Sequence, residues 1–257
     1  MRLFKFVDNI SFDFVGQRYL AFFVTGVMVL GSIGLLTFKG LNYGIDFTGG
    51  VMIEVKTPTA PDLTKMRTDL NSLGLGNISI QEFGDAQNLM IRVPEQKGSM
   101  EEQKDSIEKI KSKLNSEFSE QKVEYRRTEY VGPQVGEELK KSGIWAFILT
   151  VAAIMGYIWY RFEWQYGVAA ILSLLHDTTA VIGLFSLTWM HFDLGTLAAV
   201  LLVAGYSTND TVIVFDRIRE NRRKFKKMSA RDVINLSVNQ TLARTLSTSA
   251  TTLLSLI

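Results

Sequence analysis

Asp210 is an acid inside a stretch that otherwise has the composition of a membrane span. Leu, Ala, Val and Gly dominate residues 194–205, and residues 212–215 are apolar again. A helix needs about 20 mostly apolar residues to cross the hydrocarbon layer, so this stretch spans only if it includes Asp210. An acid at the bilayer centre costs roughly 2.5–3.5 kcal/mol and usually lies on an ion or proton path in a bundle interior. Two other interpretations stay open: the span ends early and leaves Asp210 near the headgroups, or Asp210 makes only a structural bond between helices.

Two further ionisable residues, Arg244 and Asp177, lie in segments that the sequence predicts to be helices in the membrane. Arg244 lies among hydroxyl residues spaced three or four apart, and lipid cannot satisfy such a polar stripe, so it must face protein. Arg244 is therefore the natural partner for Asp210, although a side chain that extends to the membrane surface is the alternative. Asp177 lies near the middle of another apolar run and shares a helix face with Ser173. Asp177 either relays protons or only stabilises a contact between helices.

The composition excludes several other kinds of chemistry. The chain has no Cys, which rules out disulfides and thiolate metal sites, and its two His lack the spacing of zinc ligands. A net charge of +2 gives no argument for nucleic acid as a partner. No nucleophile, metal or phosphate-loop pattern is present, so we expect neither an enzyme nor a cofactor, and only a coupling ion.

Apolar runs predict an α-helical polytopic membrane protein. A basic N-terminal segment at 1–18 and a basic loop at 216–240 favour the cytoplasmic side. The sequence predicts a fifth span at 241–257 that is incomplete, with no sixth span in this chain. Glycines at Gly26, Gly31 and Gly34 permit close helix contact in the first span. The four complete spans are predicted at 19–38, 143–160, 166–190 and 194–215.

Residues 39–142 are polar and predict one small soluble domain on the outer, periplasmic side. Alternating β-branched stretches and helical repeats give the order strand, helix, strand, strand, helix, strand. This βαββαβ order predicts an α+β, ferredoxin-like domain. Its charges are expected to form a solvated face rather than a site.

Gly44, Asp46, Gly49 and Gly50 belong to the motif GIDFTGG, which lies just before the first predicted strand. Glycines at such a place supply positive φ angles, so turn formation is the simplest interpretation. The motif GYSTNDTVIVFDRIREN covers 205–221, and NQTLARTLSTSATT covers 239–252. Together the three motifs resemble the SecF family of bacterial protein-export membrane proteins. The resemblance covers essentially the whole chain.

The resemblance implies a fold, partners and a function. SecF-like proteins have a bundle of the resistance-nodulation-division (RND) type with six spans, and they pair with SecD. The complex associates with the SecYEG channel and YajC in the bacterial inner membrane. It uses the proton gradient, or sodium in some relatives, to promote late steps of preprotein export on the periplasmic side.

The resemblance also implies roles for individual residues. Asp210 and Arg244 correspond by motif to family residues in ion coupling, and Thr248 belongs to the matching Thr-Ser-x-Thr-Thr part. The motif at 44–50 corresponds to a structural and coupling element. Two alternatives stay open: an exporter of small molecules or lipids from the same superfamily, and a scaffold that only stabilises the channel or SecD.

Overall fold

The computed structural model describes residues 11–96, 100–118 and 123–255. It divides into two compact units. The first, called the bundle, comprises Met1–Asn42 and Ala146–Ile257, and the second, called the sheet unit, comprises Tyr43–Trp145. Parts of the predicted N-terminal segment, soluble domain and fifth span lie outside the described residues.

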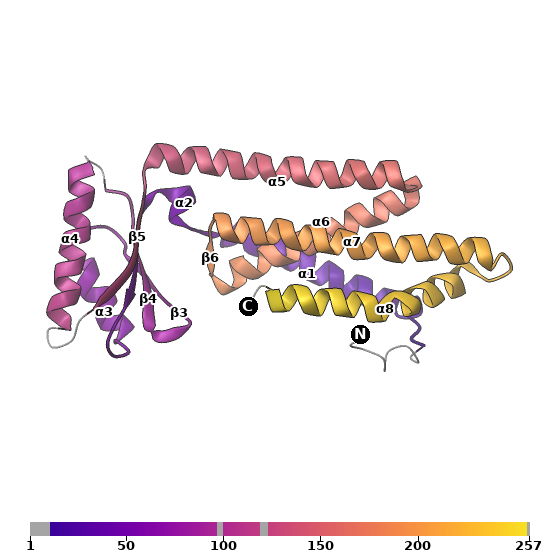
Figure 1. The fold of residues 1–257 in the computed structure, drawn as a ribbon, viewed down its shortest axis with the longest axis horizontal. Helices are drawn as coiled ribbons and strands as arrows, with labels where there is room; N and C mark the ends of the chain where they lie inside the picture. The colour runs from indigo at the N-terminus through magenta and orange to yellow at the C-terminus, as the bar shows by residue number, and fades with distance from the viewer. Residues whose placement is uncertain (1–10, 97–99, 119–122, 256–257) are drawn as a thin grey trace. The chain divides into compact units, whose positions relative to one another are not determined.

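The sheet unit contains a four-stranded antiparallel sheet in the order β3-β4-β2-β5 (Figure 1). Val51 in β2 lies opposite Val93 in β4 and Tyr130 in β5, which fixes the register of the central strand. Helices α3 and α4 cover one face of this sheet. The elements are β2 (Gly50–Lys56), α3 (Leu63–Asn71), β3 (Ser79–Phe83), β4 (Asp85–Val93), α4 (Met100–Glu117) and β5 (Glu124–Val131).

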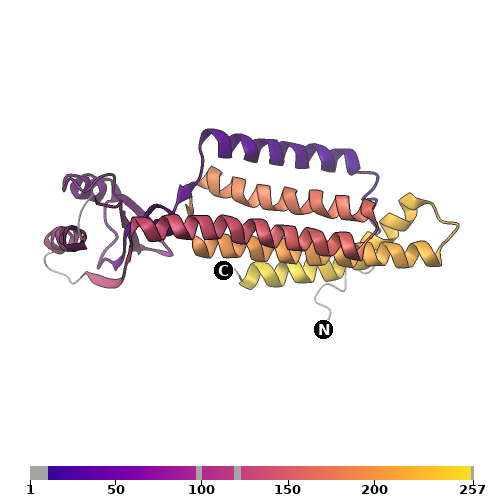
Figure 2. The same ribbon diagram turned by 90° about the horizontal axis from the view of Figure 1, so that it is seen from above.

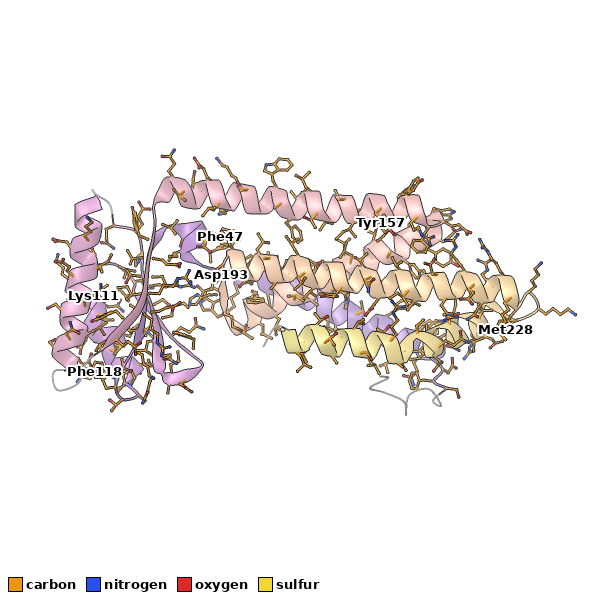
Figure 3. The ribbon with its side chains drawn as sticks, in the orientation of Figure 1. Phe47, Lys111, Phe118, Tyr157, Asp193 and Met228 are labelled. Carbon is orange, nitrogen blue, oxygen red and sulfur yellow. The ribbon has the colours of Figure 1, made fainter. Side chains whose placement is uncertain are left out.

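A dry apolar core joins the sheet to its two helices. Alternate residues of β2 point to the same face, so Val51, Ile53 and Val55 are all fully buried. The helices contribute pairs spaced four apart, which lie on one helical face. Side chains fill the space between the sheet and these helices (Figure 3). In the same view Lys111 lies on α4, and Phe118 directly follows the last residue of that helix. The buried helix residues are Met66 and Leu70 in α3 and Ile110 and Leu114 in α4.

The bundle contains long apolar helices. Among the described residues, four helices are long and apolar enough to cross a membrane. They are α1 (Arg18–Phe38), α5 (Pro133–Arg161), α6 (Trp164–Thr188) and α7 (Leu194–Lys224). Of these, α1 lies beside α6, and α6 lies beside α7 (Figure 2). Only the part of α5 from Ala146 onward belongs to the bundle. A fifth helix, α8 (Ala230–Ser255), is not one of these four and lies along α7 (Figure 1).

Helix α7 continues beyond the predicted span. It runs for 31 residues from the Asp193 cap, and Met228 lies in the turn that follows it (Figure 3). The predicted basic loop at 216–240 is therefore helical except for residues 225–229. Arg217 donates to Glu220 at 2.9 Å, and pairs at this spacing support a helix beyond the apolar run.

Helix α1 packs against α6 through small side chains. A Cβ atom added to Gly183 would collide with Ser32, so the two backbones approach closely here. Ser186 donates to the carbonyl of Gly40 at 2.7 Å. A Cβ added to the three glycines expected to make such contacts would meet no described atom within 4 Å; these are Gly26, Gly31 and Gly34.

A polar contact of Asn42 and an aromatic cluster complete the bundle. Within the bundle, the Asn42 side-chain amide donates to the carbonyl of Trp189 at 2.9 Å, and it lies 3.0 Å from Nδ1 of His191. The rings of Phe162, Tyr166 and Phe215 pack together, which joins the residue after α5 to the first turn of α6 and to α7.

Candidate functional site

Asp210 on α7 contacts Thr248 on α8. The Thr248 Oγ1 atom lies 3.0 and 2.9 Å from the two carboxyl oxygens of Asp210. It also lies 2.9 Å from the carbonyl of Thr245, and a hydroxyl has only one proton. The contact therefore suits either form of the acid. Thr248 donates to an ionised Asp210, or it accepts from a protonated Asp210 while donating to the Thr245 carbonyl.

Asp210 and Asp177 line the same cavity, which has a volume of about 590 Å³ and lies among α6, α7 and α8. Most of the other lining side chains carry hydroxyl groups. The buried Oγ1 of Thr245 has no hydrogen-bond partner among the described atoms, and such an atom calls for water or an ion. The cavity is thus polar enough and large enough for several waters or a hydrated cation. Its hydroxyl residues are Ser173, Ser207, Thr211, Thr245 and Ser249.

Asp177 links α6 to α7. The Ser207 hydroxyl donates to one carboxyl oxygen of Asp177. The other oxygen lies 2.8 Å from Nδ1 of His176. The side chain of His176 is 25% exposed and that of Asp177 is 31% exposed. The structure therefore places Asp177 both in a contact between helices and at the cavity wall.

Arg244 is not paired with Asp210 in this structure. Within the described residues Arg244 makes no ion pair, and it is exposed. It lies four residues before Thr248, which puts both residues on one face of α8, about 6 Å apart along the helix axis. The expected direct contact is replaced by the Thr248 hydroxyl.

The motif at 44–50 forms a single helical turn followed by a sharp change of direction. Gly44 precedes α2 (Ile45–Thr48), and Gly49 and Gly50 follow it with φ angles of 72° and 119°. A Cβ at Gly50 would collide with the carbonyl of Val93, so both the backbone angle and the space require glycine there.

The same motif contacts the start of α5 within the sheet unit. A Cβ at Gly136 would lie 3.1 Å from the backbone nitrogen of Gly49 and 3.7 Å from the carbonyl of Asp46. Ile45 and Phe47 are buried. These contacts hold the motif against the first turn of α5.

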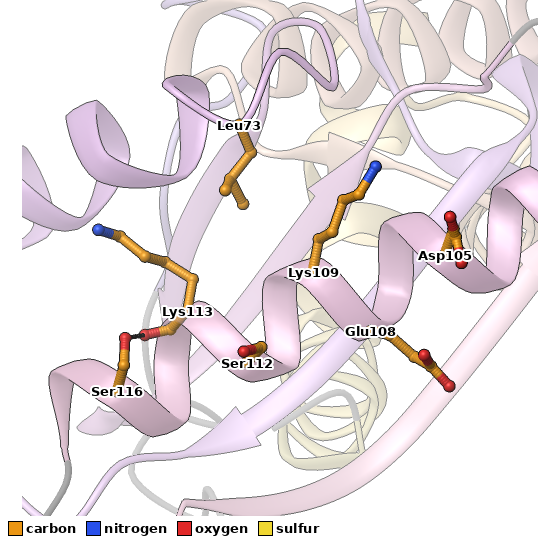
Figure 4. Close-up of a pocket in the computed structure, with 7 residues that line it drawn as sticks. All are labelled: Leu73, Asp105, Glu108, Lys109, Ser112, Lys113 and Ser116. Carbon is orange, nitrogen blue, oxygen red and sulfur yellow. Dashed lines mark hydrogen bonds between the residues drawn. The ribbon is translucent and has the colours of Figure 1, made fainter.

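A second cavity, of about 480 Å³, lies in the sheet unit beside Leu73 and α4 (Figure 4). Two acids and two lysines of α4 line it, and the dashed line in Figure 4 joins Ser116 to the carbonyl of Lys113. In the described part of the chain no group of three His, Cys, Asp or Glu residues could hold a metal ion. This cavity has the character of a solvated surface.

Sequence reasoning did not assign roles to several cavity residues. Ser207 was given no role, although its position three residues before Asp210 puts both on one face of α7. A hydroxyl residue three positions from a membrane acid is the pattern that identifies Ser207. Thr245 and Ser249 are four positions apart on α8 but have no acid near them in sequence, and the packing of α8 brings them to the cavity.

Family models match both the sheet unit and the bundle. The model described as "Protein export membrane protein SecD/SecF, C-terminal" matches residues 109–257, and the "SecD/SecF GG Motif" model matches residues 34–57. The second match contains the turn at 44–50.

Proteins named protein translocase subunit SecF are similar to this chain over most of its length. The protein translocase subunit SecF of Rickettsia felis is 44% identical over 249 residues, which is 96% of this chain and 79% of the relative. The corresponding subunit of Rickettsia prowazekii is 42% identical over 253 residues, which is 97% of this chain and 80% of the relative.

Solved structures of SecDF are similar in fold. The crystal structure of SecDF, a translocon-associated membrane protein from Thermus thermophilus, matches with a TM-score of 0.83 at 33% identity and covers 96% of this chain. SecDF in its super-membrane-facing form matches with a TM-score of 0.64, also at 33% identity. This chain spans 33% of the length of each of those SecDF chains. The chain, with its four long apolar helices and its GG-motif turn, belongs to the SecD/SecF family of protein-export membrane proteins.

Proposed function

We propose that the chain is an accessory subunit of the Sec protein translocase that acts with a SecD partner. Together they use the proton gradient, with sodium as the alternative ion, to promote late steps of preprotein export across the bacterial inner membrane. SecYEG, YajC and the preprotein are the other proposed partners. The contact of Asp210 with Thr248 across two helices, at the wall of a polar cavity, is the observation that carries this proposal.

We place the sheet unit on the periplasmic side as a ferredoxin-like domain. The strand order β3-β4-β2-β5, with two helices on one face, supports that fold. The basic end of α7, including Arg222, Arg223 and Lys224, supports a cytoplasmic location for the turn between α7 and α8.

In the proposed cycle, Asp210 exchanges its partner on α8. A protonated Asp210 is neutral and stays with the Thr248 hydroxyl, which tolerates both forms of the acid. An ionised Asp210 attracts the guanidinium of Arg244, which lies one helical turn away on the same face of α8. A one-turn slide of α8 along α7 would bring the two charges together, and packed interfaces switch between such discrete registers.

The membrane potential limits the free energy that one proton can supply to this exchange. One charge that crosses 100 mV is worth about 2.3 kcal/mol. A switch from 1:99 to 99:1 needs about 5.5 kcal/mol. More than one proton, an added pH difference or a partial switch is therefore required in each cycle.

Replacing Asp210 tests the proposal directly. In membrane vesicles with the complete complex, Asp210→Asn should abolish gradient-stimulated export while assembly with SecD is retained. Arg244→Met should give the same defect, because the ionised state loses its partner. Asp216→Asn is the matched control, since Asp216 lies on the same helix but pairs with Arg161 at 3.1 Å at an exposed position. Normal stimulation in Asp210→Asn would refute the coupling role.

A further inference from the structure

We propose that His176 and Asp177 form a second protonation site at the cavity of Asp210, so that the bundle takes up two protons in each cycle. This inference rests on the proposed function. Its basis is a chain of hydrogen bonds across two helices, in which His176 Nδ1 lies 2.8 Å from Asp177 and the Ser207 hydroxyl binds the other carboxyl oxygen.

His176 supplies a base that a purely structural contact does not need. Its Nε2 atom is buried and has no hydrogen-bond partner among the described atoms. Buried polar atoms are normally bonded, and those without a partner call for an explanation. A neutral imidazole that donates through Nδ1 keeps a lone pair on Nε2. The pair therefore holds an unused proton acceptor next to a carboxylate.

The pair can gain a proton without moving an uncompensated charge into the bundle. Before uptake, neutral His176 donates to ionised Asp177, and the net charge of the pair is −1. After uptake, either imidazolium faces carboxylate, or Nδ1 accepts from a protonated carboxyl group while Nε2 carries the other proton. The net charge is zero in both forms, so the proton belongs to the pair. Of the two residues in the pair, only Asp177 lines the cavity, so protons reach the pair through the Asp177 side chain.

Few other charges face this pair. On α1 the only ionisable groups are Arg18 and Tyr19 at its beginning, and α6 has no acid or base beside the pair except Tyr166 near its first turn. Asp210 on α7 lines the same cavity, and Arg244 on α8 is exposed. The bundle part of α5 has Tyr157, Tyr160 and Arg161, all near its far end. Asp210 is therefore the neighbouring acid whose protonation the pair senses.

Two protons meet the energetic demand much better than one. A nearly complete switch requires a change of about 10⁴-fold in the equilibrium constant. One charge crossing 100 mV supplies about 50-fold. Two charges supply about 2,500-fold, which approaches the requirement without a large pH difference.

The voltage dependence of export tests the second site. Export of a preprotein is measured in sodium-free vesicles that contain the complete complex, at several membrane potentials. Asp177→Asn and His176→Gln should each retain stimulation but halve the slope of the logarithm of the stimulated rate against potential. His191→Gln, the same replacement at the chain's other histidine, should keep the full slope.

The outcomes separate this inference from the proposed function. Full slope in both Asp177→Asn and His176→Gln would overturn the second site, even if Asp210→Asn abolishes stimulation. Complete loss in Asp177→Asn with assembly intact would also overturn it, because a single shared site would then be at work. Normal export in Asp210→Asn would instead refute the proposed function.

Nuclear magnetic resonance supplies a test that does not depend on export. The chain has two histidines, so His191→Gln leaves His176 as its only imidazole. At alkaline pH the ¹⁵N signals of His176 should report a protonated Nδ1 and a bare Nε2, and Asp177→Asn should remove the strongly hydrogen-bonded Nδ1 proton signal. A protonated Nε2 with a bare Nδ1 would contradict the proposed pair.

Discussion

The sheet unit and the bundle are stabilised in different ways. In the sheet unit, strands and helices meet through an apolar core whose largest side chains, such as Ile53 and Leu114, are fully buried. In the bundle, large apolar side chains such as Leu20 and Phe22 are mostly exposed. Buried contacts between its helices are often polar: Asn221, 3% exposed, donates to Ser237 and to Gln240 at 2.9 Å each.

The difference follows from the solvent of each unit. Water drives apolar side chains together, so a sheet in water needs a dry core. Lipid is as apolar as leucine, so helices in a membrane associate through close packing and hydrogen bonds. The groups that associate the helices are therefore of the same chemical kind as the groups that bind ions. This explains why the candidate site lies in the bundle rather than in the sheet unit.

Truncation of a core leucine should have the largest effect on stability. Leu114→Ala removes a fully buried side chain, and we expect the free energy of unfolding of the sheet unit to fall by about 2–5 kcal/mol. Hydrogen exchange of the β2 amides in the intact chain measures this loss. Leu20→Ala, at a side chain that is 61% exposed, should change stability by less than about 0.5 kcal/mol. Similar losses in the two variants would break the comparison between the units.

Close packing in the bundle predicts a smaller but specific effect. Gly183→Ala would force Ser32 and α1 away from α6, and overpacking of this kind costs about 1–3 kcal/mol. The thermal midpoint of the purified chain in detergent should fall by about 2–4 °C for each kcal/mol. Gly26→Ala is the control, because its added Cβ meets no described atom. Equal midpoints for the two variants would show that the α1–α6 contact contributes nothing.

Local patterns were sufficient to predict much of the molecule. The apolar runs located α1, α6 and the first part of α7, because membrane spans have a strong compositional signal. The cap at Asp62 was also predictable, and its side chain accepts from the backbone of Thr64 at 2.9 Å. Similarly, positive φ angles at Gly49 and Gly50 agree with the turn expected there.

Contacts between helices were not predictable in the same way. The sequence placed Asp210 and Arg244 on neighbouring helices, but the rotation and offset of α8 decide which residue faces the acid. Thr248 occupies that position here. Periodicity gives the face of a helix, and tertiary packing gives its register against the neighbour. The helical extension of α7 was missed because no apolar run marks it; its buried Asn221 instead donates to Ser237 and Gln240 of α8.

Outside the membrane-crossing part, a polar strap ties the chain before α1 to α8. The side chain of Asn239 binds both the N–H and the carbonyl of Phe12, at 2.9 Å each. One turn earlier, the Asn235 side chain accepts from the N–H of Val15 at 2.9 Å and donates to Asp13 at 2.6 Å. Arg231 also binds Asp13. The strap is held entirely by polar groups, which makes it the opposite extreme from the core of the sheet unit.

Lowering the pH should release this strap. We expect a smaller effect on stability than from Leu114→Ala or Gly183→Ala. The N–H of Gly16, then Asn235 and Arg231, lower the pKa of Asp13 from its ordinary value of 3.8. A lowered folded pKa means that the stabilisation is present above pH 3.8 and is lost as the pH falls through the folded value. The chain has no native cysteine, so spin labels at Ser11→Cys and Met228→Cys can report the distance between the strap and the turn that precedes α8. The distance distribution should broaden in acid, and Asp13→Asn should be broad at neutral pH as well. A distribution that stays narrow through the whole titration would show that the two asparagines hold the strap without the carboxylate.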